Sequence, residues 1–121
     1  MSRFFAKFLS LLLLTLFGLE SAVVAAVEVT CQKVEPSGWT ETSAKWQGRE
    51  LVAFASWCSS CKEEILNAAS HPEQYVLMVA FDDVESSSRV LKKLNVTAPC
   101  IYGDDLVTKL GVTSLPWTKK I

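Results

Sequence analysis

The sequence predicts an α/β domain with a mostly parallel sheet and flanking helices. Two uninterrupted apolar runs, residues 51–55 and residues 75–81, are typical of strands that are buried on both faces of a parallel sheet. Residues 59–70, which lie between these runs, carry apolar side chains at helical spacing. Strand, helix, strand and helix in this order is the alternation of a parallel sheet with right-handed crossovers.

Residues 1–26 are predicted to be an export signal peptide. Arg3 and Lys7 precede the apolar residues 8–19, and the small residues 24–26 offer a cleavage site. An uncleaved N-terminal anchor is the alternative, because residues 8–27, interrupted only by Glu20, have about the length of a bilayer span. We therefore expect an exported protein, periplasmic or secreted, that is attached to a membrane only if this segment is retained.

The remaining residues, 27–121, are predicted to form one domain. The full sequence has 12 basic and 13 acidic residues, and this balance argues against a nucleic-acid partner. Export would place all four cysteines in a compartment where disulfides persist. Cys31 and Cys100 are expected either to pair as a structural disulfide or to remain free buried thiols, and both alternatives stay open at this point.

The first half of this domain contains a predicted strand at residues 27–34, where apolar and polar positions alternate. Residues 35–48 are rich in turn-forming residues and are predicted to be a loop. The helix at residues 59–70 ends before Pro72. Its inward stripe is formed by Cys61, Ile65, Ala68 and Ala69.

The second half contains two further predicted helices. One begins at Ser86 or Ser87 and ends at Leu94. The other is short, with Asp104 as its cap and Gly111 at its end. The side chains expected to face the core are Val90, Leu91 and Leu94 in the first helix, and Leu106, Val107 and Leu110 in the second.

Cys58 and Cys61 stand where the strand at residues 51–55 meets the following helix. Two thiols at this spacing can close a disulfide, and a thiolate at a helix start is stabilised by free backbone N–H groups and by the helix dipole. Cys61 lies on the inward stripe, whereas Cys58 lies at the mouth of the helix behind Trp57. We therefore expect Cys58 to be an exposed nucleophile with a lowered pKa and Cys61 to be the shielded thiol that resolves a mixed disulfide.

A pair at this spacing could also be half of a zinc site or close a structural loop. A structural site with four cysteines usually has a second close pair, but Cys31 and Cys100 stand alone in the sequence. His71 is a weak candidate ligand, because a lone histidine at a helix end more often only ends the helix. The sequence therefore predicts neither a metal nor an organic cofactor.

Residues 54–62, Phe-Ala-Ser-Trp-Cys-Ser-Ser-Cys-Lys, resemble the active-site segment of the thioredoxin superfamily, in particular of its exported thiol-disulfide oxidoreductases. Residues 110–116, Leu-Gly-Val-Thr-Ser-Leu-Pro, resemble the Gly-Val-x-x-x-Pro segment of that family. The resemblance covers about residues 46–118. It implies a thioredoxin-like fold, a cis peptide bond before Pro116 that lies against the cysteine pair, and a strand-like contact between substrate and the backbone of Leu115.

Two departures from this family affect what we expect. Many relatives carry a buried Asp or Asn six residues before the first cysteine, where this chain has Val52. Proton transfer could instead use water or Glu64, although Glu64 is more simply a solvated helix residue. The chain also stops at Ile121, whereas the family continues into two more strands and a helix. We therefore expect a fold that lacks these C-terminal elements, leaves residues 51–55 as an exposed apolar edge, and is truncated or completed by another chain or a second copy.

The resemblance implies thiol-disulfide exchange on protein thiols outside the cytosol, with a preference for disulfide reduction. Its partners would be protein thiol or disulfide substrates and a redox partner protein. The expected catalytic residues are Cys58 and Cys61, and the expected substrate-binding residues are Trp57, Leu115 and Pro116. Two other functions stay open, a copper(I) metallochaperone that uses the same two cysteines and an inactive remnant of the family.

Overall fold

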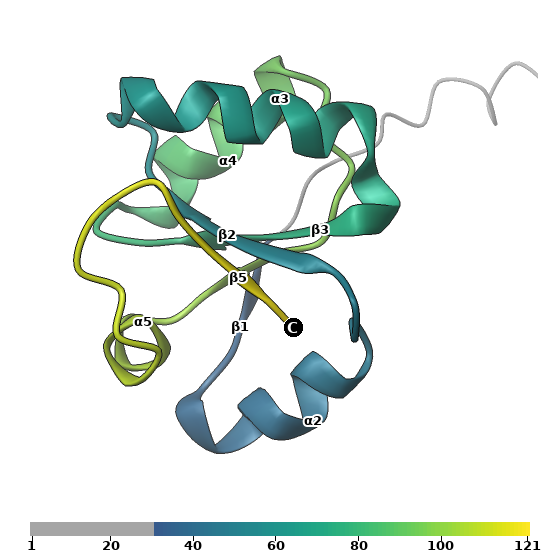
Figure 1. The fold of residues 1–121 in the computed structure, drawn as a ribbon. Coiled ribbons are helices and arrows are strands. Elements are labelled where there is room, and N and C mark those ends of the chain that lie inside the picture. Colours follow the sequence, from purple (N-terminus) through teal and green to yellow (C-terminus); the bar gives the residue numbers. More distant parts are fainter. Residues whose placement is uncertain (1–30) are drawn as a thin grey trace, which may run out of the picture.

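The computed structural model describes residues 31–121, which form a five-stranded sheet with helices on both faces (Figure 1). The strands lie side by side in the order β1-β4-β3-β2-β5. Their bounds are β1 (Gln32–Lys33), β2 (Glu50–Phe54), β3 (Tyr75–Val79), β4 (Cys100–Tyr102) and β5 (Trp117–Lys120).

The four strands β1, β4, β3 and β2 are parallel to one another, and β5 runs antiparallel to β2. In the longest parallel pairing, Glu50 lies opposite Tyr75 and Phe54 lies opposite Val79. These two strands are the two apolar runs of the sequence, and all but the first residue of each is buried. The predicted α/β architecture with a mostly parallel sheet is confirmed.

Helices pack on the sheet in two layers. Figure 1 shows α3 and α4 over one face and α2 and α5 over the other. Three short 3₁₀ helices connect these elements. The bounds are η1 (Pro36–Gly38), α2 (Trp39–Ala44), η2 (Ser59–Cys61), α3 (Lys62–Ser70), η3 (Pro72–Gln74), α4 (Val84–Lys93) and α5 (Asp104–Lys109).

The sheet separates two hydrophobic cores because successive strand residues point to opposite faces. Val52 and Phe54 of β2 belong to the core under α3 and α4, which also contains both Cys58 and Cys61. Leu51 and Ala53 belong to the core against α2 and α5. The cysteine pair is therefore anchored in the interior on the α3 side of the sheet.

The helix predicted at residues 59–70 is confirmed as η2 followed by α3. Ile65 and Ala68 are buried, and Ala69 is partly buried against the same core. The helix ends at His71, whose N–H donates to the carbonyl of Asn67. The sequence pattern therefore located this helix and its buried face correctly.

Three sequence-based boundaries are wrong. Residues 35–48 are not a continuous loop, because the turn formers at Pro36 and Gly38 begin η1 and lead directly into α2. Helix α4 begins at Val84 rather than at residue 86 or 87, because the Asp83 carboxylate caps it by accepting the Ser86 N–H at 2.8 Å. Asp104 is the first residue of α5 and does not cap it.

The prediction that residues 51–55 form an uncovered apolar edge is also wrong. Strand β5 pairs with β2 from Ala53 opposite Trp117 to Glu50 opposite Lys120. The first strand after Pro116 is thus present in this chain, and it covers the strand that leads to the cysteine pair. Most of β5 is exposed and its last two residues are lysines, which protect a sheet edge from pairing with other chains.

Within residues 31–121, none of the helices has both the length and the apolar character needed to span a membrane. The predicted signal peptide, residues 1–26, lies outside the described residues. So does the first part of the strand predicted at residues 27–34, of which the structure describes β1.

Candidate active site

Cys58 and Cys61 form a disulfide between the end of β2 and the start of α3, with their Cα atoms 5.3 Å apart. A tight turn presents the first cysteine, because the Cys58 N–H donates to the carbonyl of Ala55 at 3.2 Å. The Cys61 N–H donates to the carbonyl of Cys58 at 3.1 Å, and this bond forms the turn of η2. The pair is therefore closed at a helix start, as the spacing predicts.

The two cysteines differ in burial in the expected order. Cys61 has no exposed surface, whereas Cys58 keeps 8% of its surface exposed. Cys58 is thus less exposed than we expected from the sequence, but it is the only one of the two that solvent or a substrate can touch. An incoming disulfide would meet Cys58 first.

Ser60 contacts the sulfur of Cys58. Its Oγ lies 3.4 Å from Cys58 Sγ, and because a disulfide sulfur carries no proton, the hydroxyl is the donor. After reduction, the same hydroxyl could donate to the Cys58 thiolate and stabilise its negative charge. Nothing in the sequence distinguishes Ser60 from Ser59 in this respect.

Asp82 and Phe81 hold the segment that precedes Cys58 through hydrogen bonds. The Asp82 carboxylate accepts the Ser56 N–H at 2.8 Å and the hydroxyl of the fully buried Ser87 at 2.7 Å. The indole of Trp57 donates to the carbonyl of Phe81 at 2.9 Å. Sequence reasoning missed this role of Asp82, because one partner comes from the turn at residues 55–58, which we call the active-site turn, and the other comes from α4.

Burial raises the pKa of Asp82, but hydrogen bonds from Ser56 and Ser87 lower it by more. The net result is a pKa below the usual value of 3.8, so Asp82 is a carboxylate at any pH near neutrality. The active-site turn is therefore held by an ionised acceptor, and hydrogen bonds of this kind are stronger than those between neutral groups.

The peptide bond between Leu115 and Pro116 is cis, as the resemblance implied. Pro116 directly precedes Trp117, which lies opposite Ala53 near the end of β2. Leu115 packs against the core that contains Cys58 and Cys61. Its N–H and C=O form no backbone hydrogen bond to the described part of the chain.

No family model matches the chain, and no curated protein matches it in sequence. Among solved structures, it is similar to a secreted disulfide oxidoreductase of Mycobacterium tuberculosis that is homologous to Escherichia coli DsbE. The match has a TM-score of 0.52 and 23% sequence identity, and it covers 62% of this chain and 63% of that protein. The chain has a thioredoxin-like fold.

The interior of this thioredoxin-like fold offers Cys61 no acidic neighbour from β2. Val52 is fully buried in the same core as Cys61, and Glu64 is only half-buried. Within residues 31–121, Ser87 is the single buried polar side chain. Proton transfer to or from Cys61 through water or Glu64 stays a prediction.

The described part of the thioredoxin-like fold contains no cluster of three or more His, Cys, Asp or Glu side chains that could hold a metal ion. His71 stands alone at the end of α3. The inactive-remnant hypothesis depended on an open fold, and the pairing of β5 with β2 removes that reason.

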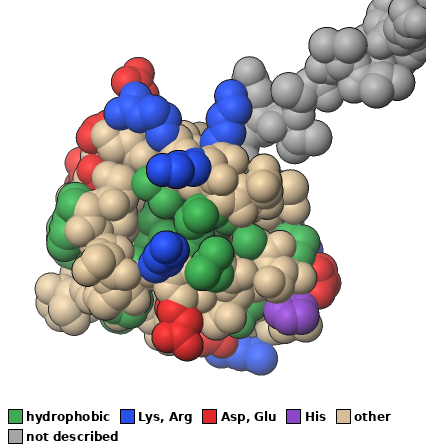
Figure 2. Space-filling model, turned by 90° about the horizontal axis from the view of Figure 1, so that it is seen from above, with side chains coloured by type: hydrophobic (Ala, Val, Ile, Leu, Met, Phe, Trp, Pro, Cys, Tyr) green, Lys and Arg blue, Asp and Glu red, His purple; other side chains and the backbone are tan. Residues whose placement is uncertain are grey.

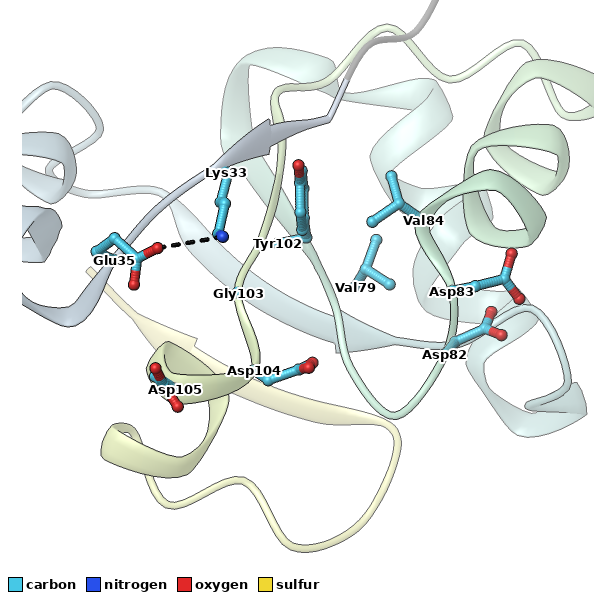
Figure 3. A pocket seen from close by; sticks show the side chains of 10 residues that line it. All are labelled: Lys33, Glu35, Val79, Asp82, Asp83, Val84, Tyr102, Gly103, Asp104 and Asp105. Atoms are coloured by element: carbon cyan, nitrogen blue, oxygen red, sulfur yellow. Dashed lines mark ion pairs between the residues drawn. The ribbon is translucent and has the colours of Figure 1, made fainter.

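Asp82 also forms part of the wall of an acidic cavity of about 360 Å³ at the carboxyl ends of β1, β4 and β3 (Figure 3). Asp83, Asp104, Asp105 and Glu35 line it as well, and Glu35 pairs with Lys33 at 3.4 Å. This side of the active-site turn is therefore negatively charged.

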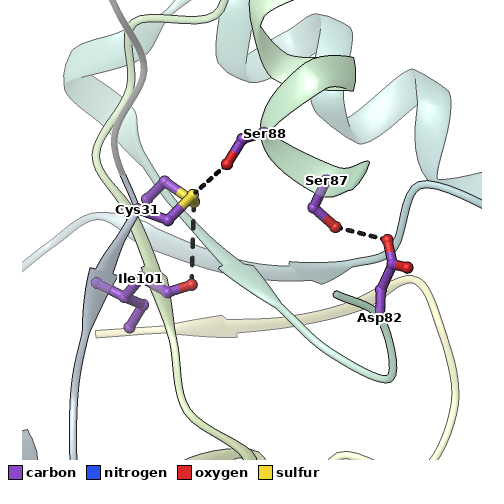
Figure 4. Close-up of a disulfide and its surroundings, with 6 residues drawn as sticks. Cys31, Asp82, Ser87, Ser88 and Ile101 are labelled. Carbon is purple, nitrogen blue, oxygen red and sulfur yellow. Dashed lines mark hydrogen bonds between the residues drawn. A yellow bond between two sulfur atoms is a disulfide. The ribbon is translucent and has the colours of Figure 1, made fainter. Parts of the chain in front are cut away.

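A second disulfide joins Cys31, just before β1, to Cys100 at the start of β4 (Figure 4). The structure thus decides the alternative left open by the sequence. The hydroxyl of Ser88 lies 3.7 Å from the sulfur of Cys31. Ser87, the preceding residue of α4, binds Asp82, so one turn of this helix supports both disulfide regions.

Proposed function

We propose that the protein catalyses thiol-disulfide exchange on protein thiols outside the cytosol. The observation that carries this proposal is the Cys58–Cys61 disulfide at the start of α3 in a thioredoxin-like fold. The difference in burial supports distinct roles, with Cys58 as the nucleophile and Cys61 as the resolving thiol.

The reaction begins with both cysteines reduced. The Cys58 thiolate attacks one sulfur of a substrate disulfide, forms a mixed disulfide and releases the first substrate thiol. The Cys61 thiolate then attacks Cys58 Sγ, releases the second substrate thiol and closes the Cys58–Cys61 disulfide. Two electrons pass to the substrate, and the reverse sequence oxidises a substrate dithiol.

Neighbouring groups favour the attacking form of Cys58. The backbone N–H groups at the start of η2 and α3, together with the Ser60 hydroxyl, would stabilise the thiolate. Asp82 fixes the turn through the Ser56 N–H. These contacts position the sulfur before a substrate arrives.

Substrate would be bound across the turn and the cis-proline segment. The backbone N–H and C=O of Leu115, which bond to no backbone group of residues 31–121, support a strand-like contact with an extended substrate segment beside Pro116. Trp57 is 62% exposed beside Cys58 in sequence, so its ring offers apolar contact to the same segment rather than packing in the core.

We further propose that the protein works as a disulfide reductase after export and that a redox partner protein restores its dithiol. The domain would then be residues 27–121, freed from a signal peptide at residues 1–26. Equilibration with mixtures of reduced and oxidised glutathione tests the direction. A largely oxidised Cys58–Cys61 pair in glutathione-rich reducing buffer supports a reductase, and a largely reduced pair supports an oxidase.

A matched pair of variants tests the assigned roles. Cys61→Ser keeps the nucleophile. The reduced variant, mixed with insulin whose disulfides are intact, is expected to trap insulin as a mixed disulfide, seen as a mass shift. Cys58→Ser is expected to trap none and to abolish dithiothreitol-driven insulin reduction. Circular dichroism confirms that both variants are folded. Trapping by Cys58→Ser but not by Cys61→Ser would reverse the roles, and a folded wild-type protein without turnover would refute the proposed function.

A further inference from the structure

A cavity of about 260 Å³ opens directly beside Cys58, between α3 and α4. It is separate from the acidic cavity, because the two have no lining residue in common. The residues that matter here are Cys58, Ile65, Val90 and Leu94, which give it an apolar lining, and Lys62 and Lys93, which give it positive charge. It is slightly smaller than the sites that bind drug-sized ligands, so it suits a group of one or two residues in size.

Figure 2 views the face of the molecule formed by α3 and α4, and apolar side chains gather in its middle with basic side chains around them. Lys62 is the first residue of α3, Lys93 is the last residue of α4, and both are exposed. Neither forms an ion pair with a carboxylate in residues 31–121. Two ammonium groups with no anionic partner beside an apolar lining favour a ligand that combines a short apolar chain with a negative charge.

We propose that this cavity binds an anionic group carried next to the reacting sulfur of the substrate, so that the preferred substrates are disulfides with a carboxylate one short chain away from the sulfur. This inference rests on the proposed thiol-disulfide exchange. The carboxylate lies between Lys62 and Lys93, its chain lies along Val90 and Leu94, and the disulfide reaches Cys58.

The step is balanced without any further reactant. Cys58 thiolate attacks the sulfur that bears the bound arm, the substrate S–S bond breaks, and the other arm leaves as a thiolate that takes a proton from water. Cys61 thiolate then attacks Cys58 Sγ and releases the bound arm as its thiolate. The dithiol and one disulfide become the Cys58–Cys61 disulfide and two thiols.

The charge of the rest of the molecule opposes this preference. The net charge of the chain is −1, and the acidic cavity lies on the other side of the active-site turn. A general electrostatic attraction would therefore favour cationic disulfides. A preference for anionic disulfides can only come from the basic groups close to Cys58.

Three disulfides of similar length test the proposal. They are 3,3′-dithiodipropionate, bis(2-hydroxyethyl) disulfide and cystamine, whose arms end in a carboxylate, a hydroxyl and an ammonium group. The full-length reduced protein is mixed with each, and the loss of the Cys58 thiol is followed by alkylation and mass spectrometry. Each rate is divided by the rate of the same disulfide with dithiothreitol, because the leaving thiol itself affects the rate.

We expect the normalised rate to be about threefold higher for the dianion than for the neutral disulfide, because exposed ion pairs contribute an effect of about this size. The rate should be lowest for cystamine. Lys93→Gln should reduce the ratio of dianion to neutral rates to near one. Lys92→Gln is the matched control, since it removes the same charge from the preceding residue of α4, and Lys92 does not line the cavity. The Lys92→Gln variant should keep the wild-type ratio.

The outcomes separate this inference from the proposed function. No reaction of any disulfide with a folded wild-type protein refutes both. Reaction with equal normalised rates, a preference for cystamine, or equal effects of Lys93→Gln and Lys92→Gln refutes the anionic site alone. A further test uses two disulfide-linked peptides, one with Glu and one with Lys next to the cysteine, to identify the source of the carboxylate. If the protein discriminates between these peptides, the carboxylate belongs to protein substrates. If it discriminates among the small disulfides but not between the peptides, the carboxylate belongs to small molecules.

Discussion

The two disulfides of this protein are similarly buried, but one joins distant segments of the chain and the other joins near neighbours. Cys31–Cys100 joins residues 69 positions apart and ties β1 to β4 at one edge of the sheet. Cys58–Cys61 joins residues three positions apart at the mouth of one helix. Their exposed fractions are 8% and 5% in the first pair and 8% and 0% in the second. Burial alone therefore does not separate the disulfide that closes the long loop from the one for which we propose a redox role.

What distinguishes them is the length of chain they constrain and the groups around the sulfur. Closing a loop as long as that of Cys31–Cys100 removes about 4 kcal/mol of conformational entropy from the unfolded chain, and a four-residue loop removes only about 2 kcal/mol. Cys58, in contrast, has a hydroxyl donor, a helix start and an open cavity beside it. We infer that Cys31–Cys100 serves mainly to hold the fold, and these groups support the proposal that Cys58–Cys61 reacts with substrate.

The largest expected effect is on stability. Replacing Cys31 and Cys100 together by Ser should lower the free energy of unfolding by about 4 kcal/mol. Replacing Cys58 and Cys61 together by Ser should lower it by about half as much. Urea denaturation of both double variants, followed by circular dichroism, measures the difference. Equal losses in the two variants would contradict the division into structural and reactive disulfides.

A smaller effect is expected at Asp82, whose carboxylate supports the active-site turn. Asp82→Ala removes the acceptor for Ser56 and leaves the buried hydroxyl of Ser87 without a partner, which should cost about 2 kcal/mol. The variant should also slow alkylation of the reduced Cys58. Asp83→Ala is the control, because it loses the α4 cap at a cost of about 1 kcal/mol but does not hold the turn. If Asp83→Ala slowed alkylation equally, Asp82 would have no special role in positioning Cys58.

The same carboxylate has a defined pH dependence. The pKa of Asp82 is lower in the folded protein than its usual value of 3.8, so its stabilising contribution is complete above that value and is lost as the pH falls through the lower, folded value. Asp82→Asn should therefore cost most near neutral pH, and its difference from the wild type should shrink below pH 3.8. A difference that grows on acidification would show that the hydrogen bonds do not favour the ionised form.

The smallest expected effect concerns Ser60. Ser60→Ala removes the hydroxyl that lies 3.4 Å from Cys58 Sγ and should raise the pKa of the reduced Cys58 thiol, because its thiolate loses a hydrogen-bond donor, with little change in stability. Ser59→Ala is the matched control at the neighbouring position. The pH dependence of Cys58 alkylation measures both. Identical shifts would mean that the contact in the oxidised protein does not persist after reduction.

The sequence predicted those parts of the fold whose residues are buried on every side. Strands β2 and β3 stand out as apolar runs because helices cover both faces of the sheet. Strand β5 was missed because its Thr118, Lys119 and Lys120 are exposed, so it carries no apolar pattern. Helix α2 was missed because turn-forming residues surround it and none of its residues is fully buried.

The candidate site divides in the same way. The closed Cys58–Cys61 pair and the cis bond before Pro116 were predicted because short sequence motifs indicate them, and their chemical roles stay predictions. Asp82 was not, because its role depends on Ser56, which is 26 positions away, and on the exact start of α4. The cavity beside Cys58 was missed for a similar reason, since it requires α3 and α4 to lie side by side. Roles that arise from contacts between distant segments need the three-dimensional structure.

The arrangement of the two disulfides also imposes an order on the making of the protein. Cys58–Cys61 is nested inside the loop closed by Cys31–Cys100, and the partner of Cys31 is the last of the four cysteines to be synthesised. Within the chain, a Cys31 thiol that forms a disulfide before Cys100 emerges has only Cys58 and Cys61 as partners, and such a bond must be reshuffled before the native pairing forms. Under the export proposed above, native pairing would therefore depend on keeping Cys31 reduced until Cys100 has also crossed the membrane.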